Sequence, residues 1–225
     1  LHPRSELLMA EIVVEETRII EDPQGDGSRL WGALTYWGLH AWVLAYCVVM
    51  LSAFFIQFVM GEFPCPLCML QRYGMILATL GALLVIMQAR RGVLTTARYA
   101  QGLGMGLVGV LAGASVSIRQ IELHILPGDP GYGEPFLRLH LYTWAFITFA
   151  IVMIYVGVML MLMPRGIPRA PAAGSSAHKV STVIIWLFIG VVAANVIAII
   201  FLEGFAAVLP DDPTGYNLID QLTGG

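Results

Sequence analysis

The sequence has little charge and few cysteines for its length. Asp, Glu, Lys and Arg make up 12% of its 225 residues, whereas soluble domains carry about 25%. Hydrophobic residues make up 58%, which is too much apolar surface for a disordered chain. The net charge of -3 provides no basic face for nucleic acid, and three cysteines cannot form the disulfide framework of a small secreted protein. We therefore expect an integral membrane protein that binds membrane lipid and no nucleic acid.

Five long gaps between charged residues predict five transmembrane helices. A helix that crosses the hydrocarbon core of a bilayer needs about 20 apolar residues. The second gap is short, but it reaches full length if its helix begins near Pro66 and carries Arg72 into the membrane. The fold class expected is all-α, in a polytopic membrane protein. The gaps cover residues 30–61, 73–89, 99–118, 139–164 and 180–202.

The positions of Lys and Arg predict the orientation of these helices. Three precede the first helix, three lie between the second and third, and three lie between the fourth and fifth, which makes nine of the twelve. Cytoplasmic flanks retain positive charge, so the N-terminus is expected inside and the C-terminus outside. The expected parts are an acidic cytoplasmic arm (1–29), a helical membrane bundle (30–163), a flexible cytoplasmic linker (164–179), a fifth span (180–203) and a periplasmic tail (204–225).

The segment between the first two helices contains a Cys-x-x-Cys sequence, Cys65-Pro66-Leu67-Cys68. This spacing suits a redox disulfide or half of a zinc site. A structural zinc site needs four N or S ligands, and the remaining cysteine, Cys47, lies about 20 Å down the first helix. A redox pair is therefore the stronger interpretation, and Cys47 is expected to be a small residue of the apolar core.

The two cysteines and a following arginine have unequal environments. Pro66 suits the first position of a helix, which puts Cys68 in the first turn, where free N–H groups and the helix dipole favour a thiolate. Cys65 precedes the helix and is expected to be the better exposed to another protein's thiol. Arg72 lies one turn after Cys68 on the same face. It either reaches out to phospholipid head groups or stabilises negative charge on an electron acceptor beside Cys68.

These residues resemble the DsbB family of membrane thiol:quinone oxidoreductases. The resemblance covers about residues 35–163 and rests on the cysteine pair, Arg72, and a third helix that ends in Arg119-Gln120-Ile121-Glu122-Leu123-His124. It implies a four-helix bundle in the bacterial inner membrane. It also implies an oxidoreductase that passes electrons from a periplasmic DsbA-like dithiol partner, through the Cys65–Cys68 disulfide, to ubiquinone or menaquinone. On this pattern Cys65 faces the partner, while Cys68, Arg72 and His124 face the quinone.

The sequence departs from the family in two ways. Family members usually carry a second cysteine pair between the third and fourth helices, but residues 119–138 contain no cysteine. Either the partner reacts directly with Cys65, or another chain supplies the pair, or exchange is lost. A fifth helix follows the usual four, which favours a stable partner among other membrane subunits. The alternative function is therefore a non-catalytic structural subunit of a larger membrane complex, with a static disulfide.

A third hypothesis assigns a metal or haem to Cys65, Cys68, His124 and His140. His140, at the start of the fourth helix, is either a second proton carrier at the quinone or a histidine bonded to a neighbouring loop.

Three further features complete the sequence predictions. The loop 126–133 is rich in Pro and Gly and is expected to be ordered by turns. Gly109 and Gly113 on the third helix predict the close approach of another helix. His40, inside the first helix, has no assigned role.

Overall fold

The computed structural model describes residues 26–206 and 213–223 of the chain. This described part is helical and contains no β-strand beyond an isolated bridge between Phe136 and Leu139. The elements are α2 (Asp26–Phe55), the π-helix η1 (Ile56–Met60), α3 (Pro66–Arg90), α4 (Thr96–Leu123), α5 (Leu141–Met161), the 3-10 turn η2 (Met163–Arg165), α6 (Ser176–Glu203), the 3-10 turn η3 (Gly204–Ala206) and α7 (Asn217–Thr223).

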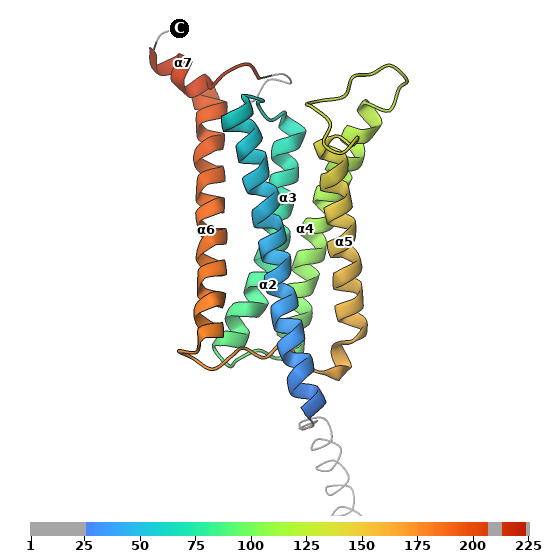
Figure 1. The fold of residues 1–225 in the computed structure, drawn as a ribbon, viewed down its shortest axis with the longest axis vertical. Helices are drawn as coiled ribbons and strands as arrows, with labels where there is room; N and C mark the ends of the chain where they lie inside the picture. The colour runs from blue at the N-terminus through green and yellow to red at the C-terminus, as the bar shows by residue number, and fades with distance from the viewer. Residues whose placement is uncertain (1–25, 207–212, 224–225) are drawn as a thin grey trace, which may run out of the picture.

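Five helices in the described part, α2 to α6, are long and apolar enough to cross a membrane. The prediction of an all-α polytopic membrane protein is thereby confirmed. The five helices run side by side, with α2 in the middle, α6 on one side of it and α4 and α5 on the other (Figure 1). Most of the acidic arm expected at 1–29 and part of the tail expected at 204–225 lie outside the described residues.

Side chains just before the helices fix where two of the spans begin. Pro66 is the first residue of α3, as predicted, and Cys65 is its N-cap, with Sγ accepting a hydrogen bond from the Cys68 backbone N–H at 3.2 Å. Ser175 caps α6 in the same way by accepting from the His178 N–H. At the other end of the α2–η1 segment, Gly61 has a φ of 76°, a left-handed conformation that glycine adopts without steric cost. The chain therefore turns sharply just before the cysteine pair.

Glycines bring α3 and α4 into close contact, which confirms the prediction for Gly109 and Gly113. A Cβ on Gly109 would collide with the backbone of Ala78 on α3. A Cβ on Gly74 of α3 would lie 2.6 Å from the Cα of Gly113. Small residues allow the backbones of α3 and α4 to pack closely. The cysteine pair and Arg72 lie at one end of this helix pair.

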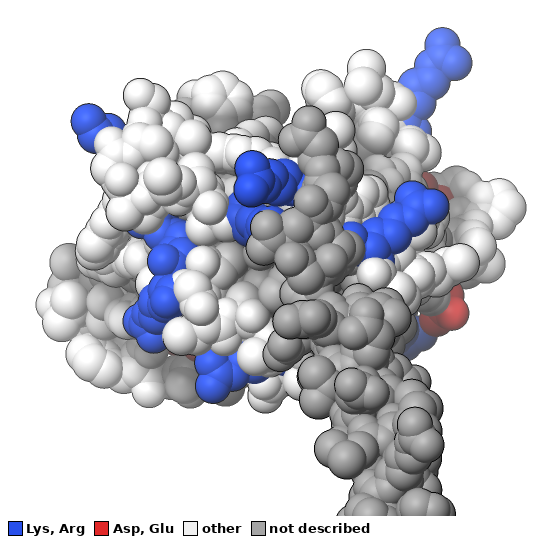
Figure 2. Space-filling view, turned by 90° about the horizontal axis from the view of Figure 1, so that it is seen from below, with Lys and Arg blue, Asp and Glu red and all other residues white. Residues whose placement is uncertain are grey.

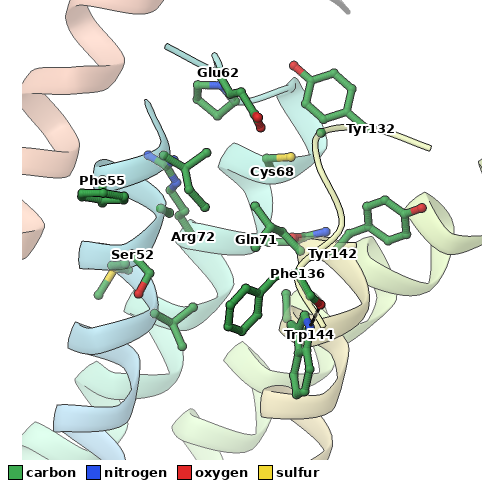
Figure 3. A pocket seen from close by; sticks show the side chains of 18 of the residues that line it. Ser52, Phe55, Glu62, Cys68, Gln71, Arg72, Tyr132, Phe136, Tyr142 and Trp144 are labelled. Atoms are coloured by element: carbon green, nitrogen blue, oxygen red, sulfur yellow. Dashed lines mark hydrogen bonds between the residues drawn. The ribbon is translucent and has the colours of Figure 1, made fainter. Parts of the chain in front are cut away.

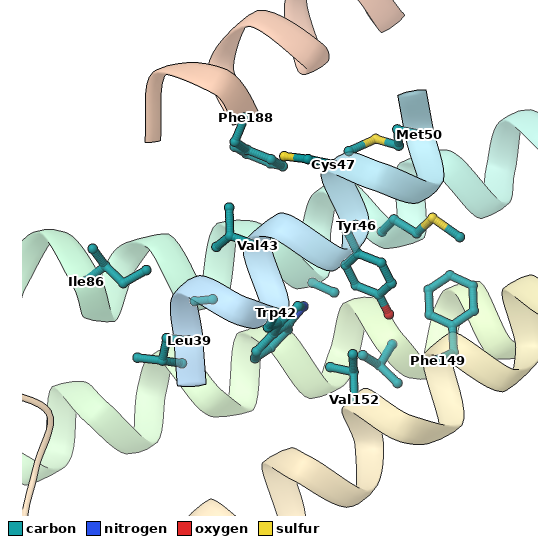
Figure 4. Close-up of a cluster of buried hydrophobic side chains, with 14 of the residues drawn as sticks. Leu39, Trp42, Val43, Tyr46, Cys47, Met50, Ile86, Phe149, Val152 and Phe188 are labelled. Carbon is teal, nitrogen blue, oxygen red and sulfur yellow. The ribbon is translucent and has the colours of Figure 1, made fainter. Parts of the chain in front are cut away.

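The centre of the bundle is apolar, and Cys47 belongs to it. Cys47 is completely buried and points toward Phe188 of α6, while Tyr46 points toward Phe149 of α5 (Figure 4). The predicted core role of Cys47 is confirmed.

A polar network joins α6 to the bundle at the lower end in Figure 1, which is the end opposite the cysteine pair. The same network contains His40. The Ser181 hydroxyl on α6 forms hydrogen bonds with Tyr36 Oη at 2.7 Å and with His40 Nε2 at 2.9 Å. Arg90, the last residue of α3, donates to the same hydroxyl and to Thr182 Oγ1, both at 2.8 Å. His40 is 1% exposed, so its polar ring is buried where these partners satisfy it.

The linker expected to be flexible at 164–179 is packed in its first half. Pro168 is buried, and the side chains of Ile167 and Ala170 pack against the core. The Arg169 N–H donates to the Gly32 carbonyl of α2 at 2.9 Å. Composition indicated a loose connector, but these apolar side chains cover the end of the bundle.

The positive charges of the described residues gather at this same end. Viewed from below, Lys and Arg side chains are spread around the helix ends and acidic ones are few (Figure 2).

Candidate redox site and cavity

The cysteine pair lies where the 61–65 segment enters α3. Both cysteines are free thiols, and their Sγ atoms are 2.7 Å apart. This separation requires only a small movement to form a disulfide. The pair is therefore positioned for reversible oxidation within a single helical turn.

Cys65 is more buried than Cys68, contrary to the expectation that it would be the better exposed thiol. Cys65 is 6% exposed, whereas Cys68 is half-buried. The preceding segment is held down on two sides: the Tyr132 hydroxyl donates to the Phe63 carbonyl at 2.7 Å, and the Phe63 ring packs edge-on against Tyr216 of the tail at 5.1 Å. The hydrogen bond between Cys65 and Cys68, together with the burial of Cys65, raises the pKa of the Cys65 thiol.

Cys68 lines a cavity of about 590 Å³. Residues of α2 and α5 form its two sides, α3 and Gln120 of α4 form its back, and residues 132–136 lie along its rim. Several of its α2 residues have largely exposed side chains, including Val48 and Phe55, so this side faces the lipid. Figure 3 shows Cys68, Gln71 and Arg72 from α3 around the same cavity as Ser52, Phe136, Tyr142 and Trp144. The walls are mainly apolar, and a few polar groups converge at the cysteine end.

Arg72 lies inside the protein and does not extend to the head groups. It is 6% exposed and lines the cavity. Its Nη1 donates to Gln57 Oε1 at 3.2 Å, and its guanidinium lies 5.3 Å from the centre of the Phe54 ring. A buried cation held beside an apolar cavity is suited to binding an electron-rich oxygen.

Two buried glutamines complete the site and were missed in the sequence. Gln71 Nε2 donates to Gln120 Oε1 at 2.8 Å, and Gln120 Nε2 lies 3.3 Å from Cys65 Sγ. Both side chains are at most 5% exposed. The available signal was an amide side chain inside an otherwise apolar span, where polar residues are rare and mark function.

The structure places the two predicted histidines outside the cavity wall. His124 Nδ1 bonds to Asp129 Oδ1 at 3.0 Å, and His140 Nδ1 donates to the Gly133 carbonyl at 3.1 Å. Their rings stack on Tyr142 with centroids 5.7 and 5.3 Å away, and only Tyr142 lines the cavity. The loop-bonded alternative for His140 is confirmed, and contacts of either histidine with a quinone remain predictions.

The loop that holds these histidines is ordered by turns, as predicted. Asp129 Oδ1 accepts from the Gly131 N–H at 2.8 Å, and this bond, with that to His124, holds the pKa of the Asp129 carboxyl below its usual range. Within the described residues no three His, Cys, Asp or Glu side chains are grouped as metal ligands. The metal or haem hypothesis, which needs Cys65, Cys68 and both histidines together, is therefore not supported by their placement.

The fold and the site define a polytopic helical membrane protein in which one cysteine of a Cys-x-x-Cys pair, Cys68, lines an apolar cavity. Residues 35–132 match the family described as "Disulfide bond formation protein DsbB". This stretch covers most of α2, all of α3 and α4 and about half of the following loop, and it includes the cysteine pair and Arg72.

Curated relatives named "Disulfide bond formation protein B" show the same similarity. The chain is 33% identical to the protein from Azoarcus sp. over 116 residues, which are 51% of this chain and 67% of that relative. It is 44% identical to the Chromobacterium violaceum protein over 77 residues, 34% of this chain and 44% of the relative. With the Marinobacter nauticus protein the identity is 40% over 88 residues, 39% of this chain and 50% of the relative.

The chain belongs to the DsbB family, and it is a multi-pass inner membrane protein. It spans about half the length of most of the curated relatives it matches. No solved structure matches the chain.

Proposed function

We propose that this protein is a thiol oxidase of the inner membrane. It takes two electrons from a periplasmic DsbA-like dithiol protein through the Cys65–Cys68 disulfide and passes them to membrane quinone. One observation carries the proposal: Cys68 and the buried Arg72 line the same apolar cavity beside a cysteine pair whose sulfurs are 2.7 Å apart.

The cavity has the size and chemistry for a quinone head group. Its volume of about 590 Å³ falls within the range of small-molecule sites, which are mostly apolar with a few placed polar groups. A bound ubiquinone or menaquinone would supply a two-electron acceptor. Arg72 would hold a quinone oxygen with its guanidinium, and the apolar side chains of α2 and α5 would enclose the ring. The exposed α2 side chains beside the cavity support entry from the lipid.

The pair's place at the end of the bundle away from the positive charges supports a periplasmic partner. Arg90, Arg91 and Arg98 lie at the opposite end of α3 and α4, and such clusters stay in the cytoplasm. The N-terminus would then lie in the cytoplasm and the C-terminus in the periplasm. An oxidising compartment allows the disulfide to persist.

The partner's thiolate attacks Cys65 in this proposal, although Cys65 is the more buried sulfur. Since Cys68 faces the cavity, Cys65 is left for exchange with protein. Phe63, two residues before Cys65, is held by Tyr132 and Tyr216, and Cys65 is 6% exposed, so this segment must move for a partner to reach the sulfur. The absent second cysteine pair makes this direct reaction the shortest route.

The test is reduction of a water-soluble quinone analogue by the purified chain in lipid nanodiscs, with a thioredoxin-like dithiol protein as donor. Wild-type protein is expected to turn over, while Cys68→Ala stops turnover and accumulates a mixed disulfide between the donor and Cys65. The proposal would be refuted if the wild-type protein reduced no quinone and Cys68→Ala trapped no donor.

The second candidate function is a structural subunit with a static disulfide. It is favoured by the buried Cys65 and by α6, a helix beyond the usual four that packs against α2. In that case the pair stays oxidised under strong dithiol, and the chain copurifies with fixed membrane neighbours.

A further inference from the structure

One amide group contacts both sulfurs of the cysteine pair. The Gln120 side chain on α4 is 1% exposed. Its Nε2 lies 3.3 Å from Cys65 Sγ and 3.6 Å from Cys68 Sγ. An amide nitrogen carries two N–H donors, so a single NH₂ group serves both reacting atoms.

A second amide fixes which way this group points. Gln71 Nε2 donates to Gln120 Oε1 at 2.8 Å. Because the carbonyl oxygen of Gln120 is held by that donor, its nitrogen is directed at the sulfurs. Burying two amides in apolar helices costs free energy unless they are hydrogen-bonded. Here the Gln71 amide bonds to the Gln120 oxygen, and the Gln120 nitrogen bonds to the two sulfurs.

We propose that Gln120 is a catalytic residue that stabilises the Cys68 thiolate during disulfide exchange, and that Gln71 is a positioning residue acting through it. The inference rests on the proposed thiol oxidase function and adds a group that neither the motif nor the family resemblance assigned.

The step concerned is the opening of the Cys65–Cys68 disulfide. A thiolate of the partner attacks Cys65 Sγ, a partner–Cys65 S–S bond forms, and the Cys65–Cys68 bond breaks. The electron pair of the broken bond stays on Cys68 Sγ. The negative charge of the attacking thiolate is thus replaced by a negative charge on Cys68, and no proton is transferred. Exchange is faster when the leaving sulfur is the better stabilised. N–H donors bind a thiolate more strongly than a neutral disulfide sulfur, so Gln120 favours both the departure of Cys68 and the reduced form of the pair.

The experiment compares Gln120→Met and Gln71→Met with wild type, using the full chain in nanodiscs. The first readout is the equilibrium of the pair with reduced and oxidised glutathione, followed by thiol alkylation without quinone or partner. For Gln120→Met we expect the equilibrium constant to shift about tenfold toward the disulfide, which corresponds to about 30 mV. Gln71→Met is expected to shift it less, in the same direction, because the Gln120 amide stays but loses its fixed orientation.

The second readout is the rate at which the thioredoxin-like dithiol reduces the pair. Loss of a single donor to a developing charge slows a reaction by about tenfold or more, and Gln120→Met should do so. Ser117→Ala is the matched control, since Ser117 is also completely buried on α4, one turn below, and among the described residues its hydroxyl bonds only to the Gly113 carbonyl. It should leave both readouts at the wild-type value.

Wild-type values for both readouts in Gln120→Met would overturn the inference. If that variant does not fold, Gln120→Asn, which keeps the amide but is one methylene shorter, together with Gln71→Met decides it by the same criteria. The two proposals fail separately. A wild-type protein that reduces no quinone refutes the thiol oxidase function while the glutathione equilibrium stays measurable. If the wild-type protein turns over and Gln120→Met has the wild-type equilibrium constant and rate, only the role of Gln120 is refuted.

Discussion

At the scale of single residues, Arg72 is the group whose position has the clearest chemical consequence. Its charge is buried, its Nη1 is held by Gln57, and it lines the cavity beside Cys68. A buried arginine is retained where its charge is used, because the cost of taking it out of water is large.

We expect Arg72→Leu to raise the apparent KM for quinone by about tenfold or more, because a cation aimed at developing negative charge is lost. Reduction of the Cys65–Cys68 disulfide by the dithiol partner, measured in a single turnover without quinone, should change little. Arg119→Leu is the matched control, because the Arg119 side chain is 61% exposed and forms an ion pair with Glu122 on its own helix. Equal KM values for Arg72→Leu and wild type would contradict a role for Arg72 at the quinone.

The residues of the predicted site that the structure brings together are near one another in the chain. Cys65, Cys68 and Arg72 lie within eight positions, so helical geometry alone relates them. Gln120 comes from another helix, and no spacing rule connects it to Cys65. The two histidines lie at helix ends, as predicted, and their bonds to Asp129 and Gly133 depend on the loop conformation, which the sequence does not give.

At the scale of helices, the charge gaps predicted the spans because the bilayer fixes how long an apolar helix must be. The start of α3 was predicted for a similar reason, since Pro66 suits only the first turn. The packed linker was not predicted, because composition describes how a segment behaves alone, and the contact of Arg169 with Gly32 depends on the finished fold.

The contact between α3 and α4 gives a prediction of its own. Gly109→Ala should destabilise the protein by about 1–3 kcal/mol, because the new Cβ would collide with the backbone of Ala78 and force the helices apart. Gly104→Ala is the control on the same helix, since a Cβ there meets no atom of the described residues within 4 Å. Thermal unfolding in detergent measures both. The close contact would be disproved as a source of stability if the two variants unfolded at the same temperature.

Polar contacts from Arg90 join α6 to the bundle at the linker end, in addition to the apolar residues of α6 in the core. Arg90→Met should weaken this attachment, because Arg90 donates to Ser181, Thr182 and His178 on α6, each at 2.8 Å. Hydrogen bonds from charged groups contribute about 1.5–3 kcal/mol, so a fall in unfolding temperature and faster cleavage at the 164–179 linker by protease are expected. Arg91→Met removes a neighbouring, exposed arginine and should have no effect. Equal cleavage of the two variants would mean that apolar packing alone holds α6.

At the scale of the whole molecule, the thiol oxidase proposal depends on which end of the bundle faces the periplasm. The cysteine pair and residues 124–140 lie at one end, and the turn between α3 and α4 and the 164–179 linker lie at the other (Figure 1). Lys and Arg side chains are spread over the linker end (Figure 2), and seven of the ten described Lys and Arg belong to it: Arg29, Arg90, Arg91, Arg98, Arg165, Arg169 and Lys179. Positive charge resists translocation, so this end should stay in the cytoplasm.

Labelling of intact cells with a membrane-impermeant maleimide tests this orientation. In a chain with Cys47, Cys65 and Cys68 replaced by Ala, Leu126→Cys should be labelled from outside, because Leu126 is 71% exposed in the loop beside the site. Val93→Cys, 47% exposed at the turn between α3 and α4, should be labelled only after the membrane is permeabilised. The reverse pattern would put the cysteine pair in a reducing compartment, where a disulfide that oxidises other proteins does not persist. The thiol oxidase proposal would then fail, however well the cavity fits a quinone.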